Sequence, residues 1–200
     1  GLNDQQKSDL KRKFARKGQL YTADDRIRLI ALDIANHFVK NIDDGLKGQL
    51  ACDSKASAIK YKKYLDEAGL FESAVVMSPP DSREGNTDVD ESTTPEVTQW
   101  WKENVGTQDE QSYTKQVIER FEKDESLKLL IVVDKLLTGF DEPKNAVLYI
   151  DKNLKQHNLI QAIARVNRLH PLKKFGLLID YRGILKELDS TILDYQDLAA

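Results

Sequence analysis

The sequence is poor in cysteine, histidine and proline: its 200 residues include one Cys, three His and five Pro. The single cysteine, Cys52, excludes an internal disulfide and any zinc site built from several cysteines. Cys52 lies in the run LKGQLACDS, which predicts a reduced thiol buried in a strand and favours a reducing, cytoplasmic compartment. His37, His157 and His170 lack the close spacing of a metal motif, so no metal site is expected.

Long apolar runs are also missing. No stretch approaches the roughly 20 apolar residues of a membrane-spanning helix, and residues 1–20 are polar and charged, unlike a secretory signal peptide. The net charge of −3 excludes a basic protein whose whole surface attracts nucleic acid, so any polyanion site must be local. The chain starts on Gly1 rather than Met, which favours a piece of a longer protein.

The sequence pattern predicts a linker and a helix within residues 1–47 and one α/β domain over residues 48–200. The basic cluster KRKFARK, residues 11–17, favours a solvated linker over a DNA-binding arm. Thr22 and Asp25 form a variant of the capping box that begins a helix. Apolar residues then recur every three or four positions, which predicts one buried helix face: Ile27, Ile30, Ala31, Ile34, Phe38 and Ile42.

Five strand-like apolar runs alternate with helical or loop segments beyond residue 47. They are GQLACDS, FESAVVMS, LKLLIVV, AVLYID and FGLLIDY. This alternation predicts an α/β fold with a doubly wound, mainly parallel sheet and helices on both faces. Leu129–Val133 is apolar throughout, which predicts a central strand that is covered on both faces. Residues 79–95 are rich in Pro, Ser, Thr and acids and predict a flexible loop.

The run VVDKLLTGFDEP contains the first candidate ligand-binding residues. Asp134 follows the apolar strand, and ligands of doubly wound sheets collect where strands end. Gly139 permits a tight turn or the close approach of a ligand, and Asp141 offers a carboxylate to a hydroxyl such as that of a ribose. From composition alone, an ordinary turn after a strand is the favoured explanation of the same residues.

The run LIQAIARVNRLHP contains the second candidate site, also expected where strands end. Helical spacing places Gln161, Arg165 and Arg168 on one side. The small Ala164 lets another backbone come close. Two guanidinium groups on one side suit a phosphate, because each donates two hydrogen bonds in a planar fork and keeps its charge. Surface arginines paired with acids are the alternative.

Together and in this order, the two motifs resemble the second RecA-like domain of superfamily 2 helicases and translocases. TGFD resembles motif V of that family, and QAIARVNR resembles motif VI, Q/H-x-x-G-R-x-x-R. Between Lys128 and Gly183 the chain more closely resembles the R (motor or restriction) subunit of type I restriction enzymes. Two departures are Ala164 in place of the motif glycine and Val133 where many helicases have a DNA-contacting threonine.

The resemblance implies a role for each matching residue. Arg165 and Arg168 would reach the γ-phosphate of ATP, with Arg168 as the arginine finger, and Gln161 would lie at the same interface. Gly139 and Asp141 would approach the ribose of the nucleotide or couple the nucleotide to DNA. Three further residues would lie near the DNA backbone: Thr138, Ser54 and Lys55.

The sequence lacks the phosphate-cradling pattern G-x-x-x-x-G-K-[ST] and the magnesium-binding pattern D-E-x-[HD]. The chain would therefore supply half of an ATP site, with ATP and Mg²⁺ held mainly by a preceding motor domain, and would be inactive alone. The resemblance implies further partners: double-stranded DNA, a nuclease domain of the same subunit, and methyltransferase and specificity subunits. Two alternatives remain open: another superfamily 2 DNA motor, and an α/β interaction module that needs no nucleotide.

Overall fold

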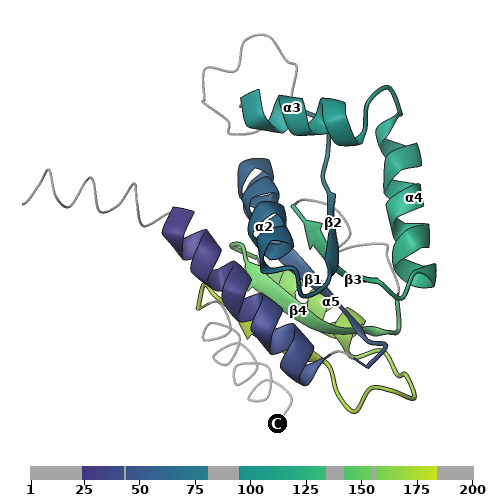
Figure 1. The fold of residues 1–200 in the computed structure, drawn as a ribbon. Helices are drawn as coiled ribbons and strands as arrows, with labels where there is room; N and C mark the ends of the chain where they lie inside the picture. The colour runs from purple at the N-terminus through teal and green to yellow at the C-terminus, as the bar shows by residue number, and fades with distance from the viewer. Residues whose placement is uncertain (1–23, 43, 81–94, 134–141, 155, 184–200) are drawn as a thin grey trace, which may run out of the picture.

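The computed structural model describes residues 24–42, 44–80, 95–133, 142–154 and 156–183 (Figure 1). Several predictions of the sequence lie outside these ranges. They concern the basic cluster at 11–17, the helix start at Thr22, most of the loop at 79–95, and the motif residues Thr138, Gly139 and Asp141.

A single parallel sheet forms the centre of the described fold. Its strands are β1 (Lys47–Cys52), β2 (Glu72–Val76), β3 (Leu127–Val132), β4 (Asn145–Asp151) and β5 (Leu177–Asp180). Every pairing is parallel and the order is β2-β3-β1-β4-β5. The five predicted strands are confirmed. The prediction that the 129–133 run is central is wrong, because β1 holds the middle position and β3 lies beside it.

The reason for this error is physical. In a parallel sheet with both faces covered, the inner strands are all buried, so the length of an apolar run does not reveal the position of a strand. β1 is fully buried although it contains Lys47, Gly48 and Gln49. Gly48 lets the neighbours close in, since a Cβ there would lie 2.7 Å from Cγ1 of Val147.

Helices cover both faces of the sheet (Figure 1). The helix of residues 24–41 and α2 (Lys55–Ala68) pack on one face, with α3 (Pro95–Asn104) against α2. The helices α4 (Glu110–Lys123) and α5 (Gln156–Val166) pack on the other. The predicted RecA-like, doubly wound α/β architecture with an N-terminal helix is confirmed.

Local sequence signals explain how these elements begin and pack. The predicted apolar stripe of the helix 24–41 is buried against the sheet, with Ala31, Ile34 and Phe38 inaccessible to solvent. Pro95, the last residue of the predicted loop, is the first residue of α3, a position that suits its fixed backbone angle. Cys52 is a free, buried thiol at the end of β1, as predicted, and burial raises its pKa.

Candidate functional site

The helix α5 separates apolar from cationic residues. Three residues on one side are buried against the sheet: Leu159, Ala162 and Val166. On the other side Gln161 and Arg165 are half-buried, and Arg168, two residues beyond the helix, is exposed. Arg165 and Arg168 each have an interaction partner within the chain. The helix therefore carries Gln161 and Arg165 on this side, whereas Arg168 lies beyond its last residue, outside the predicted helical spacing. A guanidinium and an amide are donors that suit a phosphate group.

The position of the arginines in the fold differs from the prediction. The helix α5 starts where β4 ends, and it runs back along the sheet before β5 begins. Its last residue, Val166, touches Gly176, which directly precedes β5. The prediction that the arginines lie where strands end is therefore wrong. A helix that joins two parallel strands has to return to the edge where strands start, and it brings its later residues there.

The predicted DNA-contacting residues Ser54 and Lys55 lie at the start of α2. The Ser54 hydroxyl caps this helix by accepting a hydrogen bond of 3.1 Å from the backbone N–H of Ser57. The Lys55 side chain is buried, and its Nζ donates to the backbone oxygen of Pro79 at 2.6 Å. Both residues thus have structural contacts, and a DNA contact at either stays a prediction.

A buried carboxylate organises the edge of the sheet where the strands end, here called the carboxyl edge. Asp151, the last residue of β4, is 2% exposed. It accepts hydrogen bonds from both Nη atoms of Arg26 at 2.6 and 3.0 Å, from the Tyr61 hydroxyl at 2.5 Å, and from Nε of Arg182 at 2.7 Å. The other end of the Arg182 guanidinium pairs with Asp53. This cluster joins β1, β4, α2, the helix 24–41 and the residues after β5.

The electrostatics of this cluster are balanced. Burial raises the pKa of Asp151, but hydrogen bonds from Arg26, Tyr61 and Arg182 outweigh it and hold that pKa below its ordinary value. Burial and the bond to Asp151 raise the pKa of the Tyr61 hydroxyl, so Tyr61 stays a donor. Two guanidinium groups face two carboxylates, so the cluster requires no additional anion. It is a clamp between segments rather than a phosphate site.

Sequence reasoning assigned no role to this cluster. A partial signal was present: Asp151 directly follows a buried apolar strand, the position where functional carboxylates of doubly wound sheets are found. Its partners carried no such signal, because Arg26 lies 125 residues away along the chain. Only the packing of the helix 24–41 on the sheet brings the two together.

Two further contacts tie the strand ends together at the carboxyl edge. Nζ of Lys152 donates to the backbone oxygen of Val133 at 2.5 Å, which joins the residues after β4 to the end of β3. The backbone N–H of Asn153 donates to Asp53 at 3.2 Å, which joins them to β1. The segment that leads from β4 into α5 is therefore held by contacts to the residues that follow β1 and β3.

The opposite edge, here called the amino edge, contains a buried lysine. Lys47, the first residue of β1, is inaccessible to solvent. Its Nζ donates to three backbone oxygens, those of Phe121, Asp124 at 2.7 Å and Leu127 at 3.0 Å. Burial lowers the pKa of this ammonium group. One lysine thereby connects β1 to the end of α4 and the start of β3.

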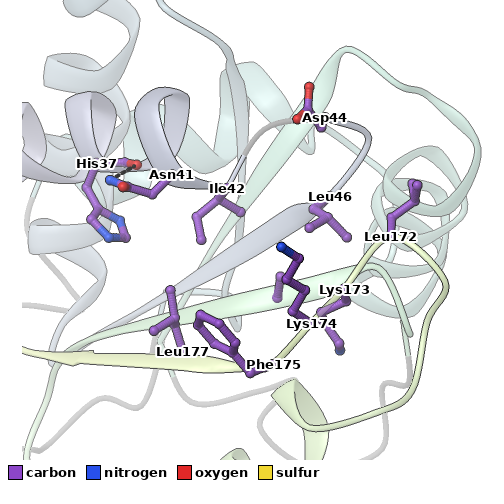
Figure 2. A pocket seen from close by; sticks show the side chains of 11 residues that line it. His37, Asn41, Ile42, Asp44, Leu46, Leu172, Lys173, Lys174, Phe175 and Leu177 are labelled. Carbon is purple, nitrogen blue, oxygen red and sulfur yellow. Dashed lines mark hydrogen bonds between the residues drawn. The ribbon is translucent and has the colours of Figure 1, made fainter.

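A pocket of about 480 Å³ also opens at the amino edge, on the face covered by the helix 24–41 (Figure 2). His37, Asn41 and Ile42 line one side and Leu172, Phe175 and Leu177 the other. The Nδ1 atom of His37 is hydrogen-bonded to the Tyr149 hydroxyl at 2.8 Å. His37 thus packs against the sheet through Tyr149. The pocket lies on the sheet face opposite α5, so it does not form part of the arginine site.

The described residues lack two kinds of site or segment. They contain no group of three or more His, Cys, Asp or Glu side chains that could hold a metal ion. None of their helices combines the length and apolar character needed to cross a membrane.

Known proteins resemble this chain in sequence. The family model for domain 3 of the type I restriction enzyme subunit R matches residues 44–183. The chain belongs to this family. The match includes the whole sheet, α5 and the carboxyl-edge residues Asp53, Tyr61, Asp151 and Arg182. Arg26 lies outside the matched range.

The curated relatives of this R-subunit domain are described as endonuclease subunits of type I restriction enzymes. The endonuclease subunit of the type I restriction enzyme HindI from Haemophilus influenzae is 33% identical over 190 residues, which cover 88% of this chain and 16% of the relative. A Staphylococcus aureus type I restriction enzyme endonuclease subunit is 46% identical over 71 residues, or 35% of this chain and 8% of the relative. The chain thus spans a small part of the length of the curated relatives that it matches.

A solved structure supports the fold of this R-subunit domain. It is a fragment from Vibrio vulnificus YJ016 described as an HsdR subunit of a type I restriction enzyme. The similarity has a TM-score of 0.51 and 16% sequence identity, and it covers 83% of this chain and 30% of that fragment. At this identity the comparison concerns the fold alone.

Proposed function

We propose that this R-subunit domain is the second half of an ATP-driven DNA-translocating motor in a type I restriction endonuclease. Arg165 and Arg168 would contact the γ-phosphate of ATP, with Gln161 at the same interface. The observation that carries the proposal is α5, which buries one apolar side in the sheet, carries Gln161 and Arg165 on the other, and ends two residues before the exposed Arg168. Membership of the R-subunit family supports it.

The donor set fits part of a triphosphate site. Two guanidinium groups supply hydrogen bonds and fixed positive charge where negative charge shifts during phosphoryl transfer. The sequence has no P-loop to cradle the phosphates and no magnesium-binding D-E-x-[HD]. A preceding motor domain of the same subunit would therefore hold ATP and Mg²⁺, and this chain would complete the site from the other side of a cleft. Bound ATP would supply the phosphoanhydride bond whose cleavage drives movement.

The proposed DNA substrate and partners follow from the family. The relatives are named endonuclease subunits of restriction enzymes, so double-stranded DNA is the proposed substrate of the complete subunit. Motif V would couple the nucleotide to DNA through Gly139, Asp141 and Thr138, near Ser54 and Lys55. A nuclease domain, a methyltransferase subunit and a specificity subunit are the proposed partners.

Substituting Arg168 in the complete subunit tests the arginine assignment. Arg168→Ala is expected to lower DNA-dependent ATP turnover by about 10³-fold or more, the typical effect of removing an arginine finger. The melting temperature of the 200-residue chain is expected to stay unchanged, because Arg168 is exposed. The matched control is Arg120→Ala, which removes an exposed arginine paired with Glu72. Unchanged turnover in Arg168→Ala would favour an interaction module that needs no nucleotide.

The same proposal makes the isolated chain inactive. It should neither bind ATP tightly nor hydrolyse it, because it lacks the loop that surrounds the phosphates. Equilibrium binding of a fluorescent ATP analogue and phosphate release by the purified chain measure both. Steady turnover that survives repeated purification would contradict the half-site assignment.

A further inference from the structure

Gly176 is pressed against the end of the arginine-bearing helix. A Cβ atom at this position would lie 2.3 Å from the backbone oxygen of Val166, 2.6 Å from its carbonyl carbon and 3.0 Å from Oδ1 of Asn167. Real Cβ atoms essentially never approach another heavy atom closer than 3.0 Å. The backbone of Gly176 is not in the left-handed region, so an alanine could adopt its conformation. Space alone therefore requires glycine here.

The other described glycines have different requirements. Four of them have a positive φ: Gly45, Gly69, Gly106 and Gly183. A Cβ on any of these four would approach no atom closer than 3.3 Å. Gly48 is crowded, but its nearest contact is the side chain of Val147 inside the sheet. Among the glycines that the structure describes, Gly176 alone is crowded by backbone atoms, and those atoms belong to the end of α5.

The crowded atoms lie between the two arginines in sequence. Val166 and Asn167 separate Arg165 from Arg168. The backbone N–H of Asn167 donates to the backbone oxygen of Ile163 at 3.1 Å, and that of Arg168 donates to the backbone oxygen of Arg165 at 3.4 Å. These two hydrogen bonds close the turn. Val166 is 2% exposed and packed against the sheet. A group inserted at Gly176 therefore has to displace this turn, the start of β5, or both.

We infer that Gly176 is a positioning residue that sets where α5 places Arg165 and Arg168. The inference rests on the proposed function of these arginines. To restore ordinary van der Waals contact, a Cβ at Gly176 has to move about 1 Å away from the Val166 oxygen. A misplacement of about 1 Å in a catalytic group can lower a rate by about 100-fold. A methyl group that touches no substrate would thus lower turnover.

The test compares two alanine substitutions in the complete subunit. Gly176→Ala is expected to lower kcat for DNA-dependent ATP hydrolysis by about 10- to 100-fold. The KM for ATP should change little, because another domain is proposed to hold the nucleotide. Gly48→Ala is the matched control, since it crowds the sheet away from α5 and should lower the melting temperature without this loss of kcat. Both are assayed well below their melting temperatures, beside Arg168→Ala.

The outcomes separate the inference from the function on which it rests. If Arg168→Ala abolishes turnover and Gly176→Ala behaves like Gly48→Ala, the positioning role is overturned and the proposed function stands. If Arg168→Ala has no effect, the proposed function fails and the positioning role fails with it. A loss of kcat in Gly176→Ala and Arg168→Ala but not in Gly48→Ala supports both.

Amide hydrogen exchange of the 200-residue chain gives a second measurement that does not depend on activity. Gly176→Ala is expected to speed exchange at Asn167 and Arg168, whose N–H groups close the end of α5, while β1 and β3 keep their protection. Equally fast exchange throughout the chain would show global unfolding and would overturn a local role for Gly176.

Discussion

The two edges of the sheet use charged side chains in different ways. At the amino edge, Lys47 places one ammonium group among three backbone oxygens, and no carboxylate takes part in these contacts. At the carboxyl edge, the buried carboxylate of Asp151 receives two guanidinium groups and a hydroxyl. Lys47 is inaccessible to solvent, whereas the side chains of Arg26 and Arg182 are 40% and 31% exposed.

This difference separates two kinds of stabilisation. Lys47 satisfies carbonyl groups where α4 ends and β3 begins, a local need of the backbone. Asp151 instead joins segments that are distant in sequence, from Arg26 in the first described helix to Arg182 after β5. The amino edge thus depends on a backbone cap, and the carboxyl edge depends on ion pairs that solvent reaches from one side.

The largest effect on stability is expected from breaking the carboxyl-edge cluster. Asp151→Asn keeps the shape of the side chain but removes the charge that two guanidinium groups share. The free energy of unfolding should fall by about 3 kcal/mol, toward the low end for a broken buried pair because water partly solvates the arginines. Urea denaturation measures the loss. The control, Asp66→Asn, removes one partner of an exposed pair with Lys62 and should cost less than about 0.5 kcal/mol. Equal losses would contradict the clamp.

A smaller effect is expected from removing the cation of the amino edge. Lys47→Met keeps the length of the side chain but leaves three backbone oxygens without their donor. The free energy of unfolding should fall by about 2 kcal/mol, since unsatisfied buried acceptors are costly while the desolvation of an ammonium group is no longer required. The matched control is Lys144→Met, whose lysine pairs with Glu125 near the same edge. If both variants lose the same stability, Lys47 does not cap the backbone as described.

The smallest expected effect is a difference between the two edges in how the free energy of unfolding depends on pH. The pKa of Asp151 is lowered in the fold, so its contribution is present above the unfolded pKa of about 3.9 and is lost as pH falls through the folded value. Lys47 has a lowered pKa but is protonated in both states at acid pH, so it contributes no slope there. Between about pH 5 and pH 2, the wild type should lose more stability than Asp151→Asn and as much as Lys47→Met. If the free energy of unfolding falls with pH along parallel curves for all three proteins, Asp151 is not the source of the acid sensitivity.

The sequence predicted the helices and strands well, but not which strands lie side by side or which charged residues are buried. Apolar runs and helical spacing predicted all five strands and the buried stripe from Ile27 to Ile42, because burial of one face imposes those periods. The order of the strands was not predictable, since β1 is central despite its lysine, glycine and glutamine. The burial of Lys47 and Asp151 was also missed, because a charged residue is buried only where packing supplies partners from distant segments.

The candidate site was predicted in part. Helical spacing correctly grouped Gln161 and Arg165 on one side of α5, and the structure buries Leu159, Ala162 and Val166 on the other. The predicted location of the arginines was wrong, because α5 starts where β4 ends but runs back to the edge of the sheet where β5 begins. The crowding at Gly176 has no sequence signature at all, because it depends on how closely two backbones pass one another. The roles of Gly139 and Asp141 stay predictions.

The burial of the Lys47 ammonium group affects its chemical reactivity. An amine that water does not reach, whose protons are donated to three carbonyl groups, cannot react with an acylating reagent until β1 separates from α4 and β3. Lysine acylation followed by mass spectrometry would therefore record the opening of this part of the sheet at a single residue. Exposed lysines such as Lys115 would react at once and serve as the internal standard. Equal labelling rates of the two residues under native conditions would contradict this protection.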